Sequence, residues 1–590
     1  MIANDVTQAI FAYHEPSGRY HINNKEVKMS AKPWLEHYDQ GVPKTLKPYP
    51  EITLIETLRE IVSIKPEFPL LLFKGAPMVA MDLDQLSDAM GAALIAKGVK
   101  KGDRVALILP NSPQSFIGLF GIWKAGGIAV PINPLYTEGE MEFALKECGA
   151  TVAMVLSPFY YKVKSIQGHT DVGLVVATNI KEYLPPVLRL LFTLVKEKKE
   201  GYRITLQTGD MWLSALLDQF ISAQKPDVQV KPEDPAIFLF SGGTTGVPKC
   251  AIGSHQGLVM SGMQINSWFR LNASEWQGSI MQNMPLFHVY GLAGVMPTGL
   301  VGHYTLVLVP NPRDMKDLVE TIHKVKPTFL PGVPSLFIAL INQPDVQSGK
   351  VSLKSIKNCI SGAAPLMNET KQRFEELTGG NIVEGYAMTE SMMGTVISPI
   401  GGTYKPGSTG MPVTDVEIRI VDTETGQEEM PVGQVGEITM RCPQLMLGYY
   451  QHPTETANSI LDGWLFTGDL GYMDEDGYLF IVDRKKDVIK PGGFQVWPRE
   501  VEEVIASHPA VAEVGVAGIA DAYSGESVKA WVVLREGKQV TDEELRQFCH
   551  TKLVGYKVPK QIEFRDSLPK SLIGKVLRRE LVRQEKSGEM

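Results

Sequence analysis

A loop rich in glycine and in hydroxyl side chains follows a short apolar run near the middle of the chain. The apolar run, residues 236–240, predicts a buried strand, so the loop leaves the end of that strand. Glycines let backbone N–H groups converge on an anion, while hydroxyls add donors and a lysine adds a positive charge. The loop therefore predicts a polyphosphate site made of Ser241, Gly242, Gly243, Thr244, Thr245, Gly246 and Lys249.

This loop is not a Walker A motif, which requires Gly-Lys-Ser or Gly-Lys-Thr, because Lys249 lies between Pro248 and Cys250. Taken alone, it is also compatible with an ordinary flexible turn. Five further segments contain residues suited to binding and catalysis. They are residues 285–292 with His288, 361–366 with Gly362, Ala363 and Ala364, 385–390 with Tyr386, Thr389 and Glu390, 467–469 with Asp469, and 569–575 with Lys575.

Length and composition indicate a large globular protein. With 590 residues, the chain is too long for one hydrophobic core and should form three or four domain-sized units. The apolar fraction of 44% and the charged fraction of 21% exclude collagen, a coiled coil and a disordered chain. The net charge of −8 argues against a nucleic-acid partner, so small molecules are the expected partners.

Cysteine spacing and hydropathy bear on the compartment. The five cysteines are scattered without a pattern suited to zinc, and the N-terminus lacks the features of a secretory signal, so a cytoplasmic protein is expected. No stretch reaches the ~18 apolar residues of a membrane-spanning helix. Residues 184–195 are apolar and precede a basic cluster at 196–199. This pattern fits either a core-packing helix, which we favour, or a helix lying on an anionic membrane surface.

The remaining pattern predicts an α/β protein, because helical and strand periodicities alternate from residue 54 onward. Helices are expected at 83–97, 115–124, 137–148, 314–324, 368–377 and 498–507, and strands at 104–109, 127–131, 150–156, 306–309 and 328–330. Short β-rich runs after residue 405 predict a small antiparallel barrel or sheet. The expected units are an arm (1–50), a first α/β subdomain (51–235), a second α/β subdomain with the phosphate loop (236–405), a small β-barrel (406–482) and a compact C-terminal α+β domain (483–590).

In this order, the loop and the five segments resemble the motifs of the adenylate-forming superfamily of acyl-CoA synthetases, peptide-synthetase adenylation domains and luciferases. The resemblance covers about residues 50–590, and the whole chain is most similar to long-chain fatty acid–CoA ligases. It implies that a fatty acid carboxylate attacks the α-phosphate of ATP, giving acyl-adenylate and pyrophosphate, after which the CoA thiolate displaces AMP. Both steps move charge at a phosphate or a carbonyl, so they need cations and fixed donors.

The resemblance implies a role for each matching residue. The loop and Lys249 would hold the β- and γ-phosphates, and Thr389 and Glu390 would contact the α-phosphate and Mg²⁺, an ion that prefers carboxylate oxygens. The small residues 362–364 would form a wall for adenine opposite Tyr386. Asp469 and Arg484 would bind the ribose hydroxyls.

Three further positions concern the reacting carboxylate and the second step. His288 would shape the pocket beside the carboxylate and would not act as a base, since a carboxylate is already ionised at pH 7. Lys575 would bridge the carboxylate and the α-phosphate. Asp483 would be the hinge of a mobile C-terminal domain, whose rotation would exchange Lys575 for the loop at 490–493, where Gly493 would let CoA pass close to the backbone.

Several alternatives stay open at this stage. The acid could be medium-chain or aryl, and the acceptor could be an acyl carrier protein in place of CoA. A non-catalytic acyl-binding protein is disfavoured because Lys249, Glu390, Asp469, Arg484 and Lys575 are all present. Peripheral contact with a membrane, a homodimer and the preferred acyl chain length are also left undecided.

Overall fold

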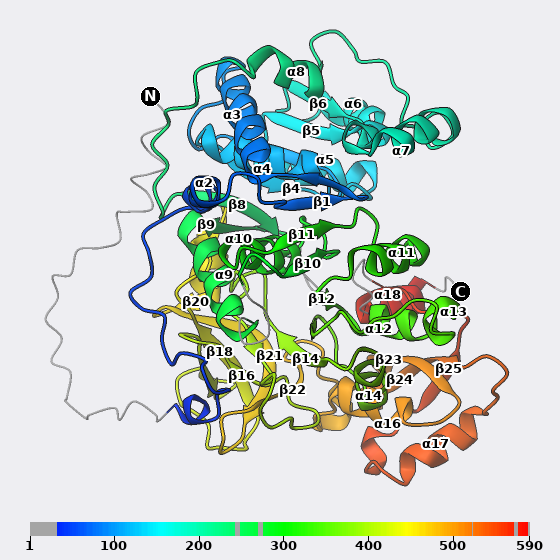
Figure 1. Ribbon diagram of the computed structural model, residues 1–590. Coiled ribbons are helices and arrows are strands. Elements are labelled where there is room, and N and C mark those ends of the chain that lie inside the picture. The colour runs from blue at the N-terminus through cyan, green and yellow to red at the C-terminus, as the bar shows by residue number, and fades with distance from the viewer. Residues whose placement is uncertain (1–31, 242–247, 270–274, 522, 571–575, 588–590) are drawn as a thin grey trace, which may run out of the picture.

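The structure is a computed structural model that describes residues 32–241, 248–269, 275–521, 523–570 and 576–587. Its first α/β layer contains an eight-stranded sheet. The strand order is β19-β9-β8-β4-β3-β5-β6-β7 (Figure 1). Its bounds are β3 Arg104–Ile108, β4 Ile128–Pro131, β5 Val152–Leu156, β6 Leu174–Thr178, β7 Met211–Trp212, β8 Pro235–Phe240, β9 Cys250–Ser254 and β19 Gly448–Tyr449. The strands from β8 to β7 run parallel, whereas β9 and β19 are antiparallel to their neighbours.

Helices cover both faces of this sheet, so its central strands are apolar on both sides. Along β3, Val105 and Leu107 pack in one core cluster with α4, while Ala106 and Ile108 pack in another with α5. Helix α5 begins at a capping box formed by Thr137 and Glu140. The helices of this layer are α2 Leu54–Ile64, α3 Ala80–Ala96, α4 Pro113–Lys124, α5 Glu138–Cys148, α6 Tyr160–Gln167, α7 Pro186–Leu191 and α8 Leu213–Phe220.

A nine-stranded sheet forms the second layer, in the order β16-β15-β14-β13-β12-β10-β11-β1-β2. Its bounds are β1 Leu71–Phe73, β2 Ala76–Met78, β10 Ser279–Gln282, β11 Thr305–Leu308, β12 Phe329–Gly332, β13 Asn358–Ser361, β14 Asn381–Tyr386, β15 Val396–Ile397 and β16 Met411–Pro412. Its helices are α9 His255–Phe269, η6 Tyr290–Val295, α10 Met296–Val301, α11 Met315–Val325, α12 Pro334–Ile341, α13 Pro344–Gln347 and α14 Asn368–Thr378. The expected helices and strands of both layers are present, with ends that differ by a few residues.

The strands of the two sheets do not divide at the expected boundary between residues 235 and 236. Strands β8 and β9, which flank the predicted phosphate loop, belong to the first sheet because β8 lies parallel to β4. Strand β1 belongs to the second sheet because it lies parallel to β11. The two layers therefore exchange strands, and the division into units at the expected residues stays a prediction.

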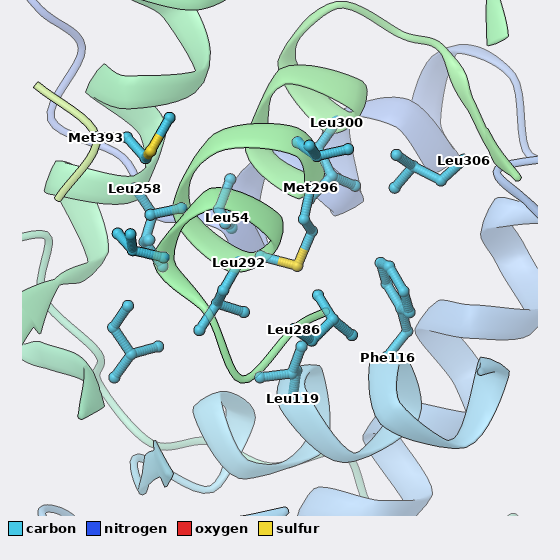
Figure 2. Packing of buried hydrophobic residues seen from close by; sticks show 14 of the residues in the cluster. Leu54, Phe116, Leu119, Leu258, Leu286, Leu292, Met296, Leu300, Leu306 and Met393 are labelled. Carbon is cyan, nitrogen blue, oxygen red and sulfur yellow. The ribbon is translucent and has the colours of Figure 1, made fainter. Parts of the chain in front are cut away.

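The largest core lies where the two layers meet. Figure 2 shows Phe116 and Leu119 of α4 facing Leu292 of η6 and Met296 and Leu300 of α10, and all five side chains are fully buried. Burial of this size stabilises the contact by ~1.5–3 kcal/mol for each large apolar side chain. The two layers are thus packed as one body.

Two smaller sheets complete the chain. The first is antiparallel, with β17 Glu417–Val421, β18 Gly436–Arg441, β20 Ile460–Leu461, β21 Trp464–Met473 and β22 Leu479–Arg484, and α15 Pro453–Ser459 lies beside it. The second belongs to the C-terminal domain, with β23 Val511–Asp521, β24 Gly525–Leu534 and β25 Gln561–Phe564, and helices α16 Pro498–Ala506, α17 Asp542–His550 and α18 Arg578–Ser587. Figure 1 shows this domain in orange and red, at the opposite end of the molecule from the first layer. The predicted fold class is confirmed.

The described part of the N-terminal arm lies on the larger body, as expected. The Tyr38 hydroxyl donates to the Pro412 carbonyl (2.7 Å), the Tyr49 hydroxyl donates to Asp415 (2.8 Å), and Trp34 is buried. The arm therefore fastens the start of the chain to residues 411–417.

The core-packing interpretation of residues 184–195 is wrong. Six apolar side chains in α7 and in the short π-helix that follows it, η4 (Phe192–Lys196), are exposed. Leu184 and Phe192 alone among the segment's leucines and phenylalanine pack against the core. Apolar periodicity cannot tell a core-facing helix from one that faces outward, so the pattern was ambiguous.

Candidate active site

A cavity of about 1640 Å³ lies between the second sheet, the five-stranded sheet and the C-terminal domain. It gathers predicted site residues that come from points far apart in the sequence. Those that line it are Ser241, Lys249, His288, Gly362, Ala363, Ala364, Tyr386, Thr389, Glu390, Asp469 and Arg484. A cavity at the junction of a large α/β region and a small domain is a typical place for a small-molecule site.

The predicted phosphate loop connects β8 to β9. Its two ends are joined, because the Ser241 N–H donates to the Lys249 carbonyl (2.8 Å) and the Lys249 N–H donates to the Ser241 hydroxyl (3.4 Å). The Lys249 ammonium lies 5.7 Å from the centre of the Tyr449 ring, a cation–π distance. The loop residues Gly242, Gly243, Thr244, Thr245 and Gly246 lie outside the described residues, so their roles stay predictions.

Thr389 and Glu390 lie in a turn that follows β14. The hydroxyl of Ser391 holds this turn, since it accepts from the Met388 N–H (3.2 Å) and lies within hydrogen-bond distance of the Met388 and Gly394 carbonyls. The Tyr449 hydroxyl donates to Oε1 of Glu390 (2.8 Å). Burial and the Glu390 carboxylate raise the pKa of Tyr449, so the hydroxyl stays a donor. Glu390 is therefore fixed with its carboxylate at the cavity.

The expected wall, Gly362 to Ala364, follows β13. The Gly362 N–H donates to the Gly332 carbonyl (3.1 Å), and Ala363 adopts a φ of 68°, a left-handed conformation that is strained for a residue with a Cβ. The wall lines the same cavity as Tyr386.

Tyr386, Asp469 and Arg484 form one hydrogen-bonded group. The Tyr386 hydroxyl donates to Oδ2 of Asp469 (2.7 Å), and Nε of Arg484 lies 3.1 Å from Oδ1. The pairing of β21 with β22 places Asp469 opposite Arg484. Burial and the Asp469 charge raise the pKa of Tyr386 well above its usual value. The Asp469 carboxylate, which two donors orient, is suited to accept hydrogen bonds from hydroxyl groups.

His288 lines the apolar side of the cavity. Its Nδ1 accepts from the Tyr290 N–H (3.2 Å), which assigns the ring proton to Nε2. Burial lowers the pKa of His288 to about 4, so the ring is neutral at pH 7. A neutral ring agrees with a pocket-shaping residue and gives it no charge with which to attract a carboxylate.

Asp483 lies buried at the junction with the C-terminal domain. It accepts from Nη1 of Arg578 (2.8 Å) and from the Arg499 N–H (2.6 Å). Arg578 also donates to both oxygens of Glu502 (2.9 and 2.6 Å) and to Asp487 (3.2 Å), and the Glu502 and Asp483 carboxylates raise its pKa. Asp483 therefore ties the C-terminal domain to the larger body.

Lys575 and Gly493, which were predicted to serve the first and the second step, differ in their position relative to the cavity. Lys575 lies outside the described residues, but the next residue, Val576, lines the cavity and pairs with Lys570. Gly493 does not line the cavity; it is exposed in the turn η7 (Pro491–Gly493) on the C-terminal domain, with a φ of 88°. In this arrangement of the domains, the chain next to Lys575 is at the site and the Gly493 turn is away from it.

Sequence reasoning did not identify several residues of the site. Tyr449 reaches Glu390 from 59 residues away, because β19 is paired with β9. Glu437 accepts from the Gly468 N–H (3.2 Å) and from Lys485 (2.6 Å), which holds the turn before Asp469. Arg578, which joins Glu502 to Asp483, belongs to none of the six motifs. Long-range pairing of this kind leaves no local pattern in a single sequence.

Comparison with known protein families shows the family to which this chain belongs. The profile of the AMP-binding enzyme family matches residues 60–450, and that of the AMP-binding enzyme C-terminal domain matches residues 500–575. The chain belongs to the AMP-binding enzyme family. The predicted resemblance is thereby confirmed.

Curated relatives align over nearly the whole chain. The chain is 39% identical to a long-chain-fatty-acid–CoA ligase of Bacillus subtilis over 566 residues, which cover 94% of this chain and 98% of that protein. It is 37% identical to a long-chain-fatty-acid–CoA ligase of Escherichia coli O6:H1 over 566 residues, which cover 95% of this chain and 99% of that protein.

Solved structures resemble the fold. The anthranilate CoA ligase AuaEII in complex with anthranoyl-AMP superposes with a TM-score of 0.79 at 26% identity and covers 91% of this chain and 98% of its own. The ATP-bound MatB of Rhodopseudomonas palustris superposes with a TM-score of 0.77 at 25% identity and covers 91% of this chain and 100% of its own.

Proposed function

We propose that this enzyme joins a long-chain fatty acid to CoA in an ATP-dependent reaction that passes through an acyl-adenylate and releases AMP and pyrophosphate. The observation that carries the proposal is the single cavity in which Lys249, Glu390 and the Tyr386–Asp469–Arg484 group meet. The names of the curated relatives agree with this activity. ATP, CoA and a fatty acid are then the substrates.

In the first step, the cavity would bind ATP in an extended form. Lys249 and the loop would hold the β- and γ-phosphates, the wall and Tyr386 would enclose adenine, and Asp469 would accept from the ribose hydroxyls. The fatty acid carboxylate would attack the α-phosphate beside Thr389, and Lys575 would neutralise the charge that develops there. Pyrophosphate is the leaving group.

Magnesium fits the donors that the site offers. Among the described residues, no cluster of three or more acidic, histidine or cysteine side chains could hold a metal ion. Glu390 supplies one hard carboxylate oxygen, and a magnesium site built from one carboxylate, substrate phosphates and water needs no more from the protein. Mg²⁺ held there would neutralise phosphate charge.

An apolar extension of the site supports an aliphatic acid. Beyond His288 the cavity is lined by Ile265, Tyr290 and Ile360, and these three also line a second, small apolar cavity of about 30 Å³ that continues toward Phe269 and Phe329. An alkyl group in contact with these apolar side chains is stabilised by ~0.8 kcal/mol for each buried CH₂ group.

In the second step, rotation at Asp483 would remove the Lys575 segment from the cavity and bring in the turn with Gly493. The exposed turn has no Cβ at Gly493, so the pantetheine thiol could pass close to the backbone. The thiolate would attack the acyl carbonyl of the adenylate, forming the thioester and expelling AMP.

The compartment and the oligomeric state expected from the sequence are also proposals. The cytoplasm is the proposed compartment, in agreement with the five cysteines, all of which are free and buried. In the part of the chain that the structure describes, no helix has the length and apolar character needed to cross a membrane. A homodimer likewise stays a proposal.

The proposal is tested with ATP, Mg²⁺, palmitate and CoA, by identifying the products with mass spectrometry. Palmitoyl-CoA and AMP in equal amounts support it. Pyrophosphate release without a thioester would move the acceptor to a carrier protein, and activity confined to octanoate or to an aryl acid would change the substrate class. Failure to adenylate any acid would contradict the proposal.

A further inference from the structure

An exposed apolar surface lies on α7 and η4. Six large apolar side chains of this segment are exposed, and their exposed fractions are 70% for Val187, 43% for Leu188, 60% for Leu190, 51% for Leu191, 73% for Leu194 and 65% for Val195. Single exposed apolar residues are ordinary on protein surfaces. A contiguous group is not, because it marks a surface that contacts another apolar body.

The rest of the protein holds this segment in place. The buried Glu197 carboxylate, just after η4, pairs with Lys181 (2.6 Å) and accepts from Asn179 Nδ2 (3.3 Å). On the inner side, the Phe192 ring packs edge-on against Tyr202, with 5.0 Å between the ring centres. The outer side chains are therefore presented by a segment anchored at both its end and its inner face.

Basic side chains border the apolar surface. They are Arg189, Lys196, Lys198, Lys199 and Arg203. Lys198 and Lys199 are exposed and form no ion pair within 4.0 Å among the residues that the structure describes. Because the chain as a whole carries a net charge of −8, this basic group is a local feature. An exposed apolar surface bordered by lysines matches the chemistry of an anionic lipid surface, into which the leucines insert while the lysines contact headgroups.

The segment lies on the same edge of the first sheet as part of the cavity wall. Strands β4, β3, β5 and β6 are parallel, so their carboxyl ends share one edge. The chain leaving β4 supplies Pro131, Asn133 and Tyr136 to the cavity, and the chain leaving β6 leads to α7, which Figure 1 shows at the right-hand end of the upper layer.

We propose that α7 and η4 dock on an anionic lipid bilayer and hold the enzyme at the surface in which its substrate dissolves. The choice of a lipid partner rests on the proposed function, since a long-chain acid partitions into membranes. A second copy of the chain is a weaker candidate. A two-fold contact would place this basic border against itself and oppose like charges.

The experiment measures co-sedimentation of the full chain with phosphatidylcholine vesicles, with and without phosphatidylglycerol. The wild type should bind the anionic vesicles, and binding should weaken as salt is raised. Leu190→Ser/Leu194→Ser should weaken binding about tenfold or more, because two leucines no longer insert. Lys198→Gln/Lys199→Gln should weaken binding to anionic vesicles about tenfold and leave neutral vesicles unaffected.

A matched control replaces exposed apolar residues elsewhere, Ile64→Ser/Val432→Ser, whose side chains are 58% and 64% exposed. This variant should bind as the wild type does. The proposal is overturned if the wild type does not bind anionic vesicles or if the Leu190→Ser/Leu194→Ser variant binds as tightly as the control. It is also overturned if that variant merely converts a dimer into a monomer. Adenylation of soluble octanoate, assayed without vesicles, reports on the proposed function separately.

Discussion

The Tyr449 hydroxyl donates to Oε1 of Glu390 over 2.8 Å, and the Tyr449 ring lies beneath the Lys249 ammonium. One tyrosine thus links the predicted metal carboxylate to the predicted phosphate loop. Tyr449→Phe removes the hydrogen bond and keeps the ring. We expect pyrophosphate release to fall about tenfold, because a hydrogen bond to a charged group contributes ~1.5–3 kcal/mol. The Mg²⁺ concentration for half-maximal rate should rise, and the KM for CoA should stay unchanged.

The neighbouring Tyr450 provides the matched control. Its ring packs against Phe238 at 4.7 Å, and it does not line the cavity. Tyr450→Phe should keep the wild-type Mg²⁺ dependence. Equal Mg²⁺ dependence of Tyr449→Phe and Tyr450→Phe would show that the Tyr449–Glu390 contact does not position the carboxylate.

Arg578 and Asp483 join the two parts that would have to separate between the steps. Replacing Arg578 with lysine keeps the charge but loses the simultaneous contacts to Glu502 and Asp483. We expect the rate of adenylation to fall about tenfold, since the closed arrangement is less stable. Conversion of preformed palmitoyl-adenylate to palmitoyl-CoA should fall much less. Single-turnover measurements of the two half-reactions test this expectation.

Arg565 serves as the control for the hinge. It pairs with Glu563 (2.6 Å) and Gln584 (2.6 Å) on the same domain but does not line the cavity. Arg565→Lys should leave both half-reactions near their wild-type rates. An equal loss in both half-reactions for Arg578→Lys would contradict a role in the first arrangement alone.

His288 makes stability depend on pH. The pKa of His288 is about 4 in the folded protein and about 6.5 in the unfolded chain, so the unfolded chain binds more protons between these values. Stability is therefore lost as the pH falls from about 6.5 toward 4. Over pH 7.5 to 5 the loss is on the order of 2 kcal/mol. His288→Gln should remove this contribution to the pH dependence of stability. Urea unfolding, followed by tryptophan fluorescence at each pH, measures the change.

An exposed histidine gives the comparison for this measurement. The side chain of His169 is 66% exposed, beside Glu142. His169→Gln should leave the wild-type slope of stability against pH. If His288→Gln also leaves that slope unchanged, burial of a neutral His288 is not a source of the pH dependence.

The features that the sequence predicted correctly are those that a local pattern of residues determines. Alternation of helix and strand located both α/β layers, and the apolar run at 236–240 located β8 at the stem of the phosphate loop. Motif residues as distant as Lys249 and Asp469 do line one cavity. Their assigned roles, and those of the loop glycines and Lys575, remain predictions.

What sequence reasoning missed depends on contacts between distant residues. The exchange of β1 and β8 between the layers and the Tyr449–Glu390 contact follow from strand pairing, which a single sequence does not encode locally. The interpretation of α7 failed for a related reason. Leucines repeat in the same way on a buried and on an exposed face, and only the position of the helix decides which face meets solvent.

We propose that two reactions use one cavity in turn, with Lys575 needed for the first alone. The most direct measurement compares wild type and Lys575→Ala in two assays: pyrophosphate release from ATP with palmitate, and palmitoyl-CoA formation from preformed palmitoyl-adenylate with CoA. We expect Lys575→Ala to lose pyrophosphate release by about a hundredfold or more and to keep thioester formation within a few-fold. Retained pyrophosphate release, or equal loss in both assays, would contradict it.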